Sequence, residues 1–384
     1  MRSLSIEITL VLLCSFFCLS AQEDSTKITL NGQVTSWGIG QFDNPFGIQL
    51  GGRFVPTLLG DLKLKQTSKL DFEASMNMNG SANFTGLQYD SVMGQLKPYR
   101  VWARYSTGRW EVRVGLQKIN FGTAKLFRPL MWFDGLDVRD PLQLTDGVYG
   151  ALGRYYFKDN ANIWLWTLMG NKKPKGFEFI GTDQWKPEVG GRFQMPAGPG
   201  ELAVSTNYRK VNVRNSSLIA PRSPLLNESR IGLDGKWDLG IGLWFESSVT
   251  RLEANADSLP RFQDAWNLGA DYTFGIGNGL GVTVEYFRYH AGDQFLLKGT
   301  TLNLVGSLFT YPVSILDNLS AMVFYVPGPD LVYNYLSWSR TYDNWSLYAI
   351  GYWNPSHFQL ITAQSQAKNL FAGRGIKLMV NYNF

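Results

Sequence analysis

The sequence has almost no cysteine and almost no histidine. Its only two cysteines are Cys14 and Cys18, and its only two histidines are His290 and His357. A chain that begins after the cysteines has no thiol for a disulfide, a thiolate metal site or a cysteine nucleophile. Ser356 adjoins His357, but neighbouring residues on a strand point in opposite directions, so the two make a poor catalytic pair. We therefore expect no enzyme, no metal site and no cofactor.

Charge and long apolar runs are also scarce. Charged residues make up 17% of the chain, and no stretch of 18 consecutive apolar residues follows residue 22, which argues against a later transmembrane helix. The net charge of +5 comes with no basic run beside a binding motif, so we expect no nucleic-acid partner. Aromatic residues reach 14%, glycine reaches 40 residues, and mean hydropathy is close to zero. This balance is typical of a membrane β-barrel, whose strands face lipid on one side and water on the other, although a large soluble all-β protein would show it too.

The N-terminus has the features of a cleaved export signal. Arg2 provides a positive charge, residues 8–19 form an apolar stretch too short to span a bilayer, and Leu19-Ser20-Ala21 is an acceptable cleavage site. We therefore expect a signal peptide over 1–21 and a mature chain over 22–384. A lipoprotein signal that uses either cysteine is disfavoured, because a bulky residue precedes each of them.

Apolar and polar residues alternate with period two along many segments, which indicates β-strands. In the last segment the even-numbered residues from Ile376 to Phe384 are apolar or aromatic, and most of the others are polar. The same alternation runs through 70–79, 110–117 and 280–287. We expect the barrel-assembly machinery to recognise the terminal strand that ends at Phe384.

Short turns and longer connections alternate between these strands. Short turn signals lie at 106–108, 158–160, 196–200, 238–240, 275–278 and 342–344. Longer polar connections lie at 80–96, 120–146, 172–185, 212–227, 254–262, 291–298 and 354–371. Tight turns at one end and longer loops at the other are typical of outer-membrane barrels. We predict an all-β fold, a single transmembrane antiparallel β-barrel of about 18 strands over 22–384. A weak pattern at 42–66 leaves 16 strands as the alternative.

Aromatic side chains gather next to the predicted turns, among them Trp102, Trp110, Trp164 and Trp166. Amphipathic rings favour the boundary between membrane and water. We therefore expect these rings to form an outward-facing girdle.

The polar sides of the strands line the lumen if the apolar sides face lipid. The basic residues expected there are Arg53, Arg100, Arg104, Arg113, Arg154, Arg192, Arg209, Arg230 and Lys236. The acids within the same run are Glu111, Glu188 and Asp234, and the later strands contribute Glu246, Asp271 and Glu285. This lopsided distribution favours a track of arginines that guides anionic solutes through the pore. The alternative is that the charges pair across neighbouring strands and fill the interior.

The connection 120–146 is unusually apolar for a loop. It holds Phe127, Leu130, Met131, Trp132 and Phe133. An apolar cluster needs burial, so we expect this loop to fold into the barrel as a constriction. The residues assigned to the constriction are Arg128, Trp132, Asp134, Asp137, Arg139 and Asp140. The alternative is an outside loop that packs on its neighbours or on another subunit.

Two motifs around this loop resemble a known group of proteins. Residues 115–122, read as Gly-Leu-Gln-Lys-Ile-Asn-Phe-Gly, are followed by Trp-Phe-Asp at 132–134 and Asp-Val-Arg-Asp-Pro at 137–141. The set is similar to the strand and infolded loop of porin-like families, of which the alginate-export and phosphate-selective porin types are the nearest. The resemblance covers about 30 residues. It implies diffusion of an anionic or sugar-like solute, and no substrate-binding residue can be matched one by one.

The combined expectation is an outer-membrane channel for passive, anion- or sugar-acid-preferring diffusion. Its partners would be outer-membrane lipids and small anionic or sugar-like solutes, and an oligomer is compatible with these features. A non-conducting structural, adhesion or assembly barrel is one alternative. A barrel for polysaccharide export is another, and it would need a periplasmic partner.

Overall fold

A computed structural model describes residues 26–65, 67–213, 225–253, 259–356 and 371–384. The predicted signal peptide lies outside these residues. Within them the chain forms strands joined by turns and loops, and no described helix is long and apolar enough to cross a membrane.

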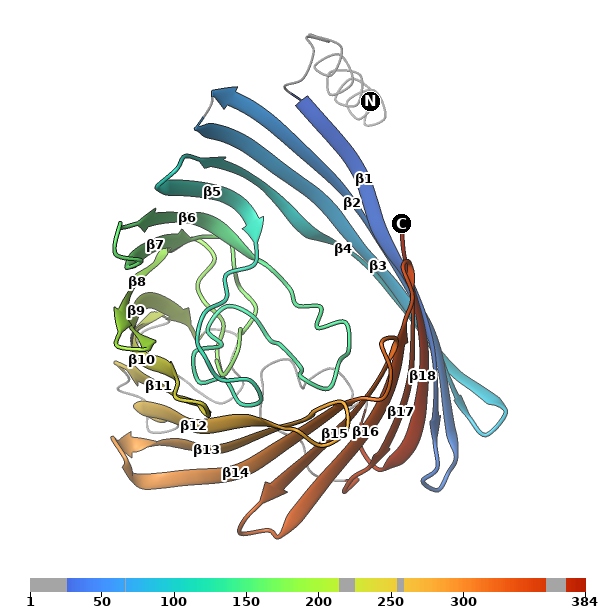
Figure 1. Cartoon of the computed structure of the whole chain (residues 1–384). Coiled ribbons are helices and arrows are strands. Elements are labelled where there is room, and N and C mark those ends of the chain that lie inside the picture. The colour runs from blue at the N-terminus through green and yellow to red at the C-terminus, as the bar shows by residue number, and fades with distance from the viewer. Residues whose placement is uncertain (1–25, 66, 214–224, 254–258, 357–370) are drawn as a thin grey trace.

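The strands form one 18-stranded antiparallel sheet that closes where β1 pairs with β18 (Figure 1). The first half comprises β1 (Thr26–Gln41), β2 (Gly47–Lys65), β3 (Ser68–Thr85), β4 (Gln88–Ser106), β5 (Trp110–Gln117), β6 (Val148–Tyr156), β7 (Asn162–Leu168), β8 (Glu188–Ala197) and β9 (Gly200–Asn212). The second half comprises β10 (Leu225–Asp238), β11 (Gly242–Leu252), β12 (Phe262–Phe274), β13 (Leu280–Gln294), β14 (Leu297–Pro312), β15 (Asp317–Val326), β16 (Leu331–Thr341), β17 (Trp345–Trp353) and β18 (Arg374–Asn383). The prediction of a barrel with about 18 strands is confirmed, and the alternative of 16 is excluded.

Burial along the strands follows the predicted period of two. On β10, Ile231 and Leu233 point outward and are 62% and 40% exposed, whereas Arg230 and Asp234 point inward and are 4% and 1% exposed. The outer surface is therefore apolar and suits a lipid bilayer, and the interior holds the charge.

The predicted connections at 80–96 and 291–298 are wrong. Strands β3 and β4 continue to Thr85 and from Gln88, and β13 and β14 are separated only by residues 295–296. The polar residues in 80–96 belong to the inward side of long strands. Asn83, for example, bonds to Gln49 on β2 and to Ser91 on β4. Gly86, with a φ of 59°, makes the tight turn.

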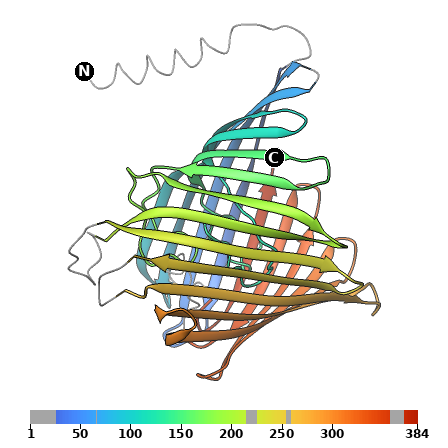
Figure 2. The same ribbon diagram turned by 90° about the vertical axis from the view of Figure 1, so that its left-hand side faces the viewer.

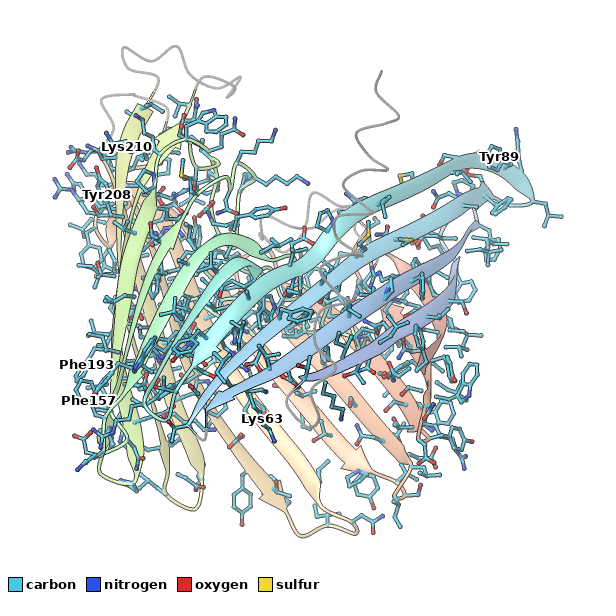
Figure 3. The ribbon with its side chains drawn as sticks, turned by 90° about the horizontal axis from the view of Figure 1, so that it is seen from above. Lys63, Tyr89, Phe157, Phe193, Tyr208 and Lys210 are labelled. Carbon is cyan, nitrogen blue, oxygen red and sulfur yellow. The ribbon has the colours of Figure 1, made fainter. Side chains whose placement is uncertain are left out.

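The wall has an uneven height. Strands β1 to β4 have 16 to 19 residues, whereas β5 to β8 have 7 to 10. A membrane-spanning strand needs about 9–11 residues, so the β3–β4 hairpin extends beyond the rest of the rim, with Tyr89 near its tip (Figure 3). Figure 2 shows that the first strands, in blue, also rise above the green and yellow strands. The short strands β5 and β7 instead lead into the long connections 118–147 and 169–187.

The predicted aromatic girdle holds only in part. Trp110 is 40% exposed on the outer surface. Trp166 is buried inside the barrel, Trp164 packs beside it, and Trp102 binds the inward Glu73. The expectation is wrong for these three rings, because nearness to a turn does not tell which side of the strand a residue occupies.

Candidate functional site

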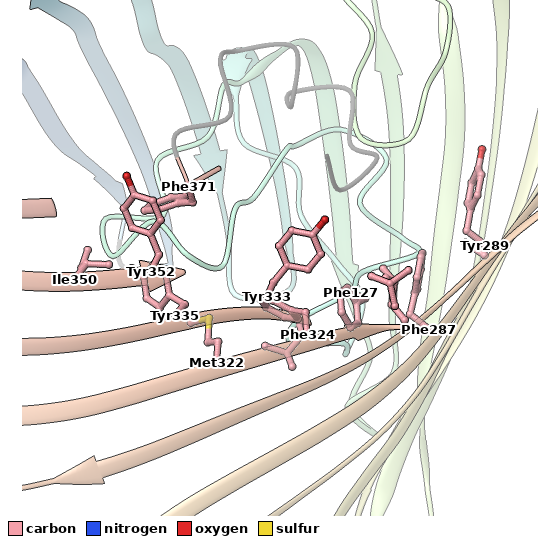
Figure 4. Packing of buried hydrophobic residues seen from close by; sticks show 14 of the residues in the cluster. Phe127, Phe287, Tyr289, Met322, Phe324, Tyr333, Tyr335, Ile350, Tyr352 and Phe371 are labelled. Carbon is pink, nitrogen blue, oxygen red and sulfur yellow. The ribbon is translucent and has the colours of Figure 1, made fainter. Parts of the chain in front are cut away.

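The connection between β5 and β6 folds into the lumen, as predicted (Figure 1). Phe127 packs against Phe287 of β13 and Phe324 of β15, with ring centroids 5.5 and 5.4 Å apart (Figure 4). The Tyr335 hydroxyl of β16 donates a hydrogen bond of 2.6 Å to the Arg139 carbonyl oxygen. The connection therefore crosses the barrel from β5 to the far wall.

The apolar residues of this infolded loop are buried, as expected. Leu130, Trp132 and Phe133 are 1%, 3% and 3% exposed and pack in one cluster with Phe121 and Trp166. The Trp132 indole nitrogen donates to the Ser248 hydroxyl at 2.8 Å. This cluster fills the lumen beside β6 and β7.

Glu246 of β11 holds the first part of the loop. Its carboxylate accepts hydrogen bonds from the amides of Thr123, Ala124 and Leu130 at 2.8, 2.9 and 2.6 Å. Gly122 lies against the same carboxylate with a φ of 100°, and a Cβ there would come within 2.5 Å of Glu246 Oε2. Glycine is needed at this position for both reasons.

Glu285 of β13 holds the next turn of the loop. Its carboxylate accepts the amides of Lys125, Leu126 and Phe127 at 2.6, 3.0 and 2.8 Å. It also accepts the Trp244 indole and the Asn267 amide. Asp271 pairs with the Lys125 ammonium. These three acids therefore anchor the loop. The assignment to an acidic pore wall is corrected for Glu246 and Glu285, which are completely buried, whereas Asp271 is partly exposed.

Several predicted pore-lining arginines are buried in ion pairs instead. Arg192 pairs with Asp234, Arg209 pairs with Glu228, and Arg230 pairs with Glu228 and with Glu178 from the connection 169–187. All three arginines are at most 4% exposed. For them the alternative of interior salt bridges holds, and they do not line an open channel.

Arg104 and Arg154 are also engaged by carboxylates. Arg104 bonds to Asp71 at 2.7 Å and to Glu111 at 3.4 Å, and Arg154 bonds to Glu111 at 3.1 Å. Arg100 is 6% exposed and donates to the Thr145 carbonyl at 2.8 Å, which fastens the far end of the infolded loop to β4.

A second group of inward cations has no carboxylate partner in the described part of the chain. Arg53 of β2 lies over the Trp37 ring at 5.7 Å, and Arg113 of β5 lies over the Trp102 ring at 4.7 Å. Lys118, at the start of the loop, was missed by the sequence analysis. All three side chains are partly exposed. Burial lowers the pKa of Lys118, while the nearby Asp134 carboxylate opposes part of this effect.

The residues assigned to the constriction divide into two sets. Arg128 and Asp134 face each other at 3.5 Å and are buried, so with Trp132 they support the fold of the loop. Asp137, Arg139 and Asp140 are partly exposed. Burial acts to raise the pKa of the Asp137 carboxyl, but the Arg139 guanidinium at 2.9 Å holds that pKa below its usual value.

His290 is the histidine that the structure describes, and it is paired with an aspartate of the neighbouring strand. His290 lies within β13 rather than in a loop, and its Nδ1 bonds to Asp264 at 2.8 Å. His357 lies outside the described residues. No group of three described histidine, cysteine, aspartate or glutamate side chains could hold a metal ion.

Comparisons with known proteins rest on structure alone. The sequence matches no protein-family model and no curated protein at a significant level. OccK5 (OpdH) of Pseudomonas aeruginosa has a TM-score of 0.56 at 11% identity, covering 94% of this chain and 98% of that one. OccAB4 of Acinetobacter baumannii gives 0.55 at 10% identity, covering 94% and 99%. The anion-selective porin from Comamonas acidovorans gives 0.50 at 15% identity, covering 94% and 100%. This chain therefore has the fold of a porin-like outer-membrane β-barrel.

Proposed function

We propose that this protein is an outer-membrane channel for passive diffusion of small anionic solutes, including sugar acids. The observation that carries the proposal is the imbalance of unpaired charge in the lumen. Arg53, Arg113 and Lys118 face the interior without a carboxylate partner among the described residues. Positive charge that is partly exposed in a low-dielectric wall concentrates anions and repels cations.

The inward carboxylates cancel little of this positive field, because most of them already bind backbone amides or arginines. Glu246 and Glu285 are saturated by backbone amides of the loop. Asp71, Glu111 and Asp234 are paired with arginines. Glu73 accepts hydrogen bonds from Ser75 and Trp102 and, like Asp140 at the edge of the loop, has no ion-pair partner among the described residues.

The infolded loop narrows the passage in this proposal. Because it crosses from β5 to β16, solutes would pass between its partly exposed edge, at Asp137 to Asp140, and the wall that carries Arg53. Aromatic rings beneath the arginines hold the guanidinium groups while leaving their edges free for a carboxylate or phosphate.

The proposal is tested by recording the purified protein in planar bilayers under a salt gradient. The expected result is stepwise conductance with a reversal potential that favours anions. A reversal potential that favours cations would contradict the charge argument. Absence of conductance would favour the alternative of a non-conducting structural barrel, and transport only with a periplasmic partner would favour polysaccharide export.

A further inference from the structure

A row of cations lies on the outer face of the barrel, at the end that carries the long connections. Lys210 of β9, Arg251 of β11 and Arg288 of β13 point outward, because they alternate with residues that are buried inside. Figure 3 shows Lys210 and Tyr208 on the outside of this wall, above Phe193. β9, β11 and β13 are every second strand of the sheet, and the pairing across β10 and β12 offsets Arg251 by two residues and Arg288 by four residues along the strands. Neighbouring cations are therefore roughly 12 and 17 Å apart along the wall.

The apolar outer surface of the barrel forms a belt that faces the lipid, and each cation of the row is close to the edge of this belt. On β13 the outward residues run from Val284 to Tyr286 to Arg288 toward the long connections. On β9 Tyr208 precedes Lys210 in the same way. Outward tyrosines mark the interface between membrane and water, so cations one step further out lie at the level of lipid headgroups.

Among the described residues, no carboxylate forms an ion pair with Lys210, Arg251 or Arg288. On the same face, Asp264 is engaged by His290 and by the Trp266 indole. Glu253 accepts the Asn227 amide, and no ion pair joins it to Arg251. A lipid-facing cation is costly unless water or an anion solvates it, so three together indicate an anionic component of the membrane.

We propose that Lys210, Arg251 and Arg288 bind the phosphate groups of lipid A, the phosphorylated glycolipid of the outer leaflet. Arginine forks fit phosphate oxygens in a bidentate way, and lysine adds a mobile charge. Acyl chains of the same lipid would lie against the apolar belt below, on Ile231, Leu268 and Val284, which are 62%, 61% and 44% exposed.

The test compares two triple variants of the full-length protein in detergent. The outer variant carries Lys210→Gln, Arg251→Gln and Arg288→Gln. The control carries Lys63→Gln, Lys158→Gln and Arg374→Gln, which remove three exposed cations elsewhere. Heat-modifiable migration on gels verifies that both barrels are folded, and native mass spectrometry then measures binding of diphosphorylated lipid A, dephosphorylated lipid A and phosphatidylglycerol.

The expected result is that the wild type and the control bind diphosphorylated lipid A at least tenfold more tightly than the dephosphorylated form, and that the folded outer variant loses this preference. Equal binding by the folded outer variant and the control would overturn the proposal. Equal affinity of the wild type for phosphatidylglycerol would overturn the assignment to lipid A. Channel conductance is an independent readout, since the outward row does not touch the lumen.

Discussion

Glu285 accepts a hydrogen bond of 2.8 Å from the amide of Phe127, 158 residues away in the chain. With the adjacent amides of Lys125 and Leu126, this contact fixes the middle of the infolded loop to β13. The position of the loop in the lumen therefore depends on a few carboxylates of the wall as well as on apolar packing.

Replacing Glu285 by Gln is expected to loosen the loop. The amide side chain keeps one acceptor but turns a donor toward backbone amides, and each hydrogen bond to a charged group contributes about 1.5–3 kcal/mol. We expect single-channel conductance to rise and to become noisier, with a lower free energy of unfolding. The matched control is Glu201→Gln, near the turn end of the barrel. Among the described residues, the Glu201 carboxylate accepts a hydrogen bond only from Gln194. Unchanged conductance in a folded Glu285→Gln protein would mean that the loop does not limit flow.

Replacing Gly122 by Ala is expected to displace the same loop from its other anchor. The added methyl group would meet the Glu246 carboxylate and would occupy a backbone conformation that costs about 1–3 kcal/mol for residues with a Cβ. Urea unfolding should show a loss of this size, and conductance should change as it does in Glu285→Gln. Gly108→Ala is the control, since nothing lies within 4 Å of its Cβ position. If both alanine variants behave alike, the close approach of Gly122 and Glu246 is not needed.

Replacing Arg192 by Gln is expected to affect stability rather than selectivity. Its guanidinium bonds to Asp234 at 2.6 and 2.8 Å, and removing one partner of a buried ion pair costs about 3–5 kcal/mol. Arg113→Gln removes a partly exposed cation with no carboxylate partner and should show the opposite behaviour. Unfolding curves and reversal potentials for both variants measure the two effects. A large change in selectivity from Arg192→Gln would show that this side chain reaches the permeating ion.

The sequence predicts the fold better than it predicts the pore. Alternation along β18 and the apolar character of 120–146 are local signals, and both led to correct expectations, for the strand and for the infolded loop. The partners of Arg209 and Arg230 are not local, because Glu178 comes from a different connection that also enters the barrel. Composition cannot tell that Glu246 faces backbone amides rather than water, since that depends on where a distant loop lies.

The most direct test of the central claim is the reversal potential of two variants, each lacking three positive charges. One carries Arg53→Gln, Arg113→Gln and Lys118→Gln inside the lumen. The other carries Lys210→Gln, Arg251→Gln and Arg288→Gln on the outer face, with the same change in net charge. The account predicts that the first variant loses anion preference while the second keeps the wild-type value. Equal reversal potentials for the two folded variants would contradict it.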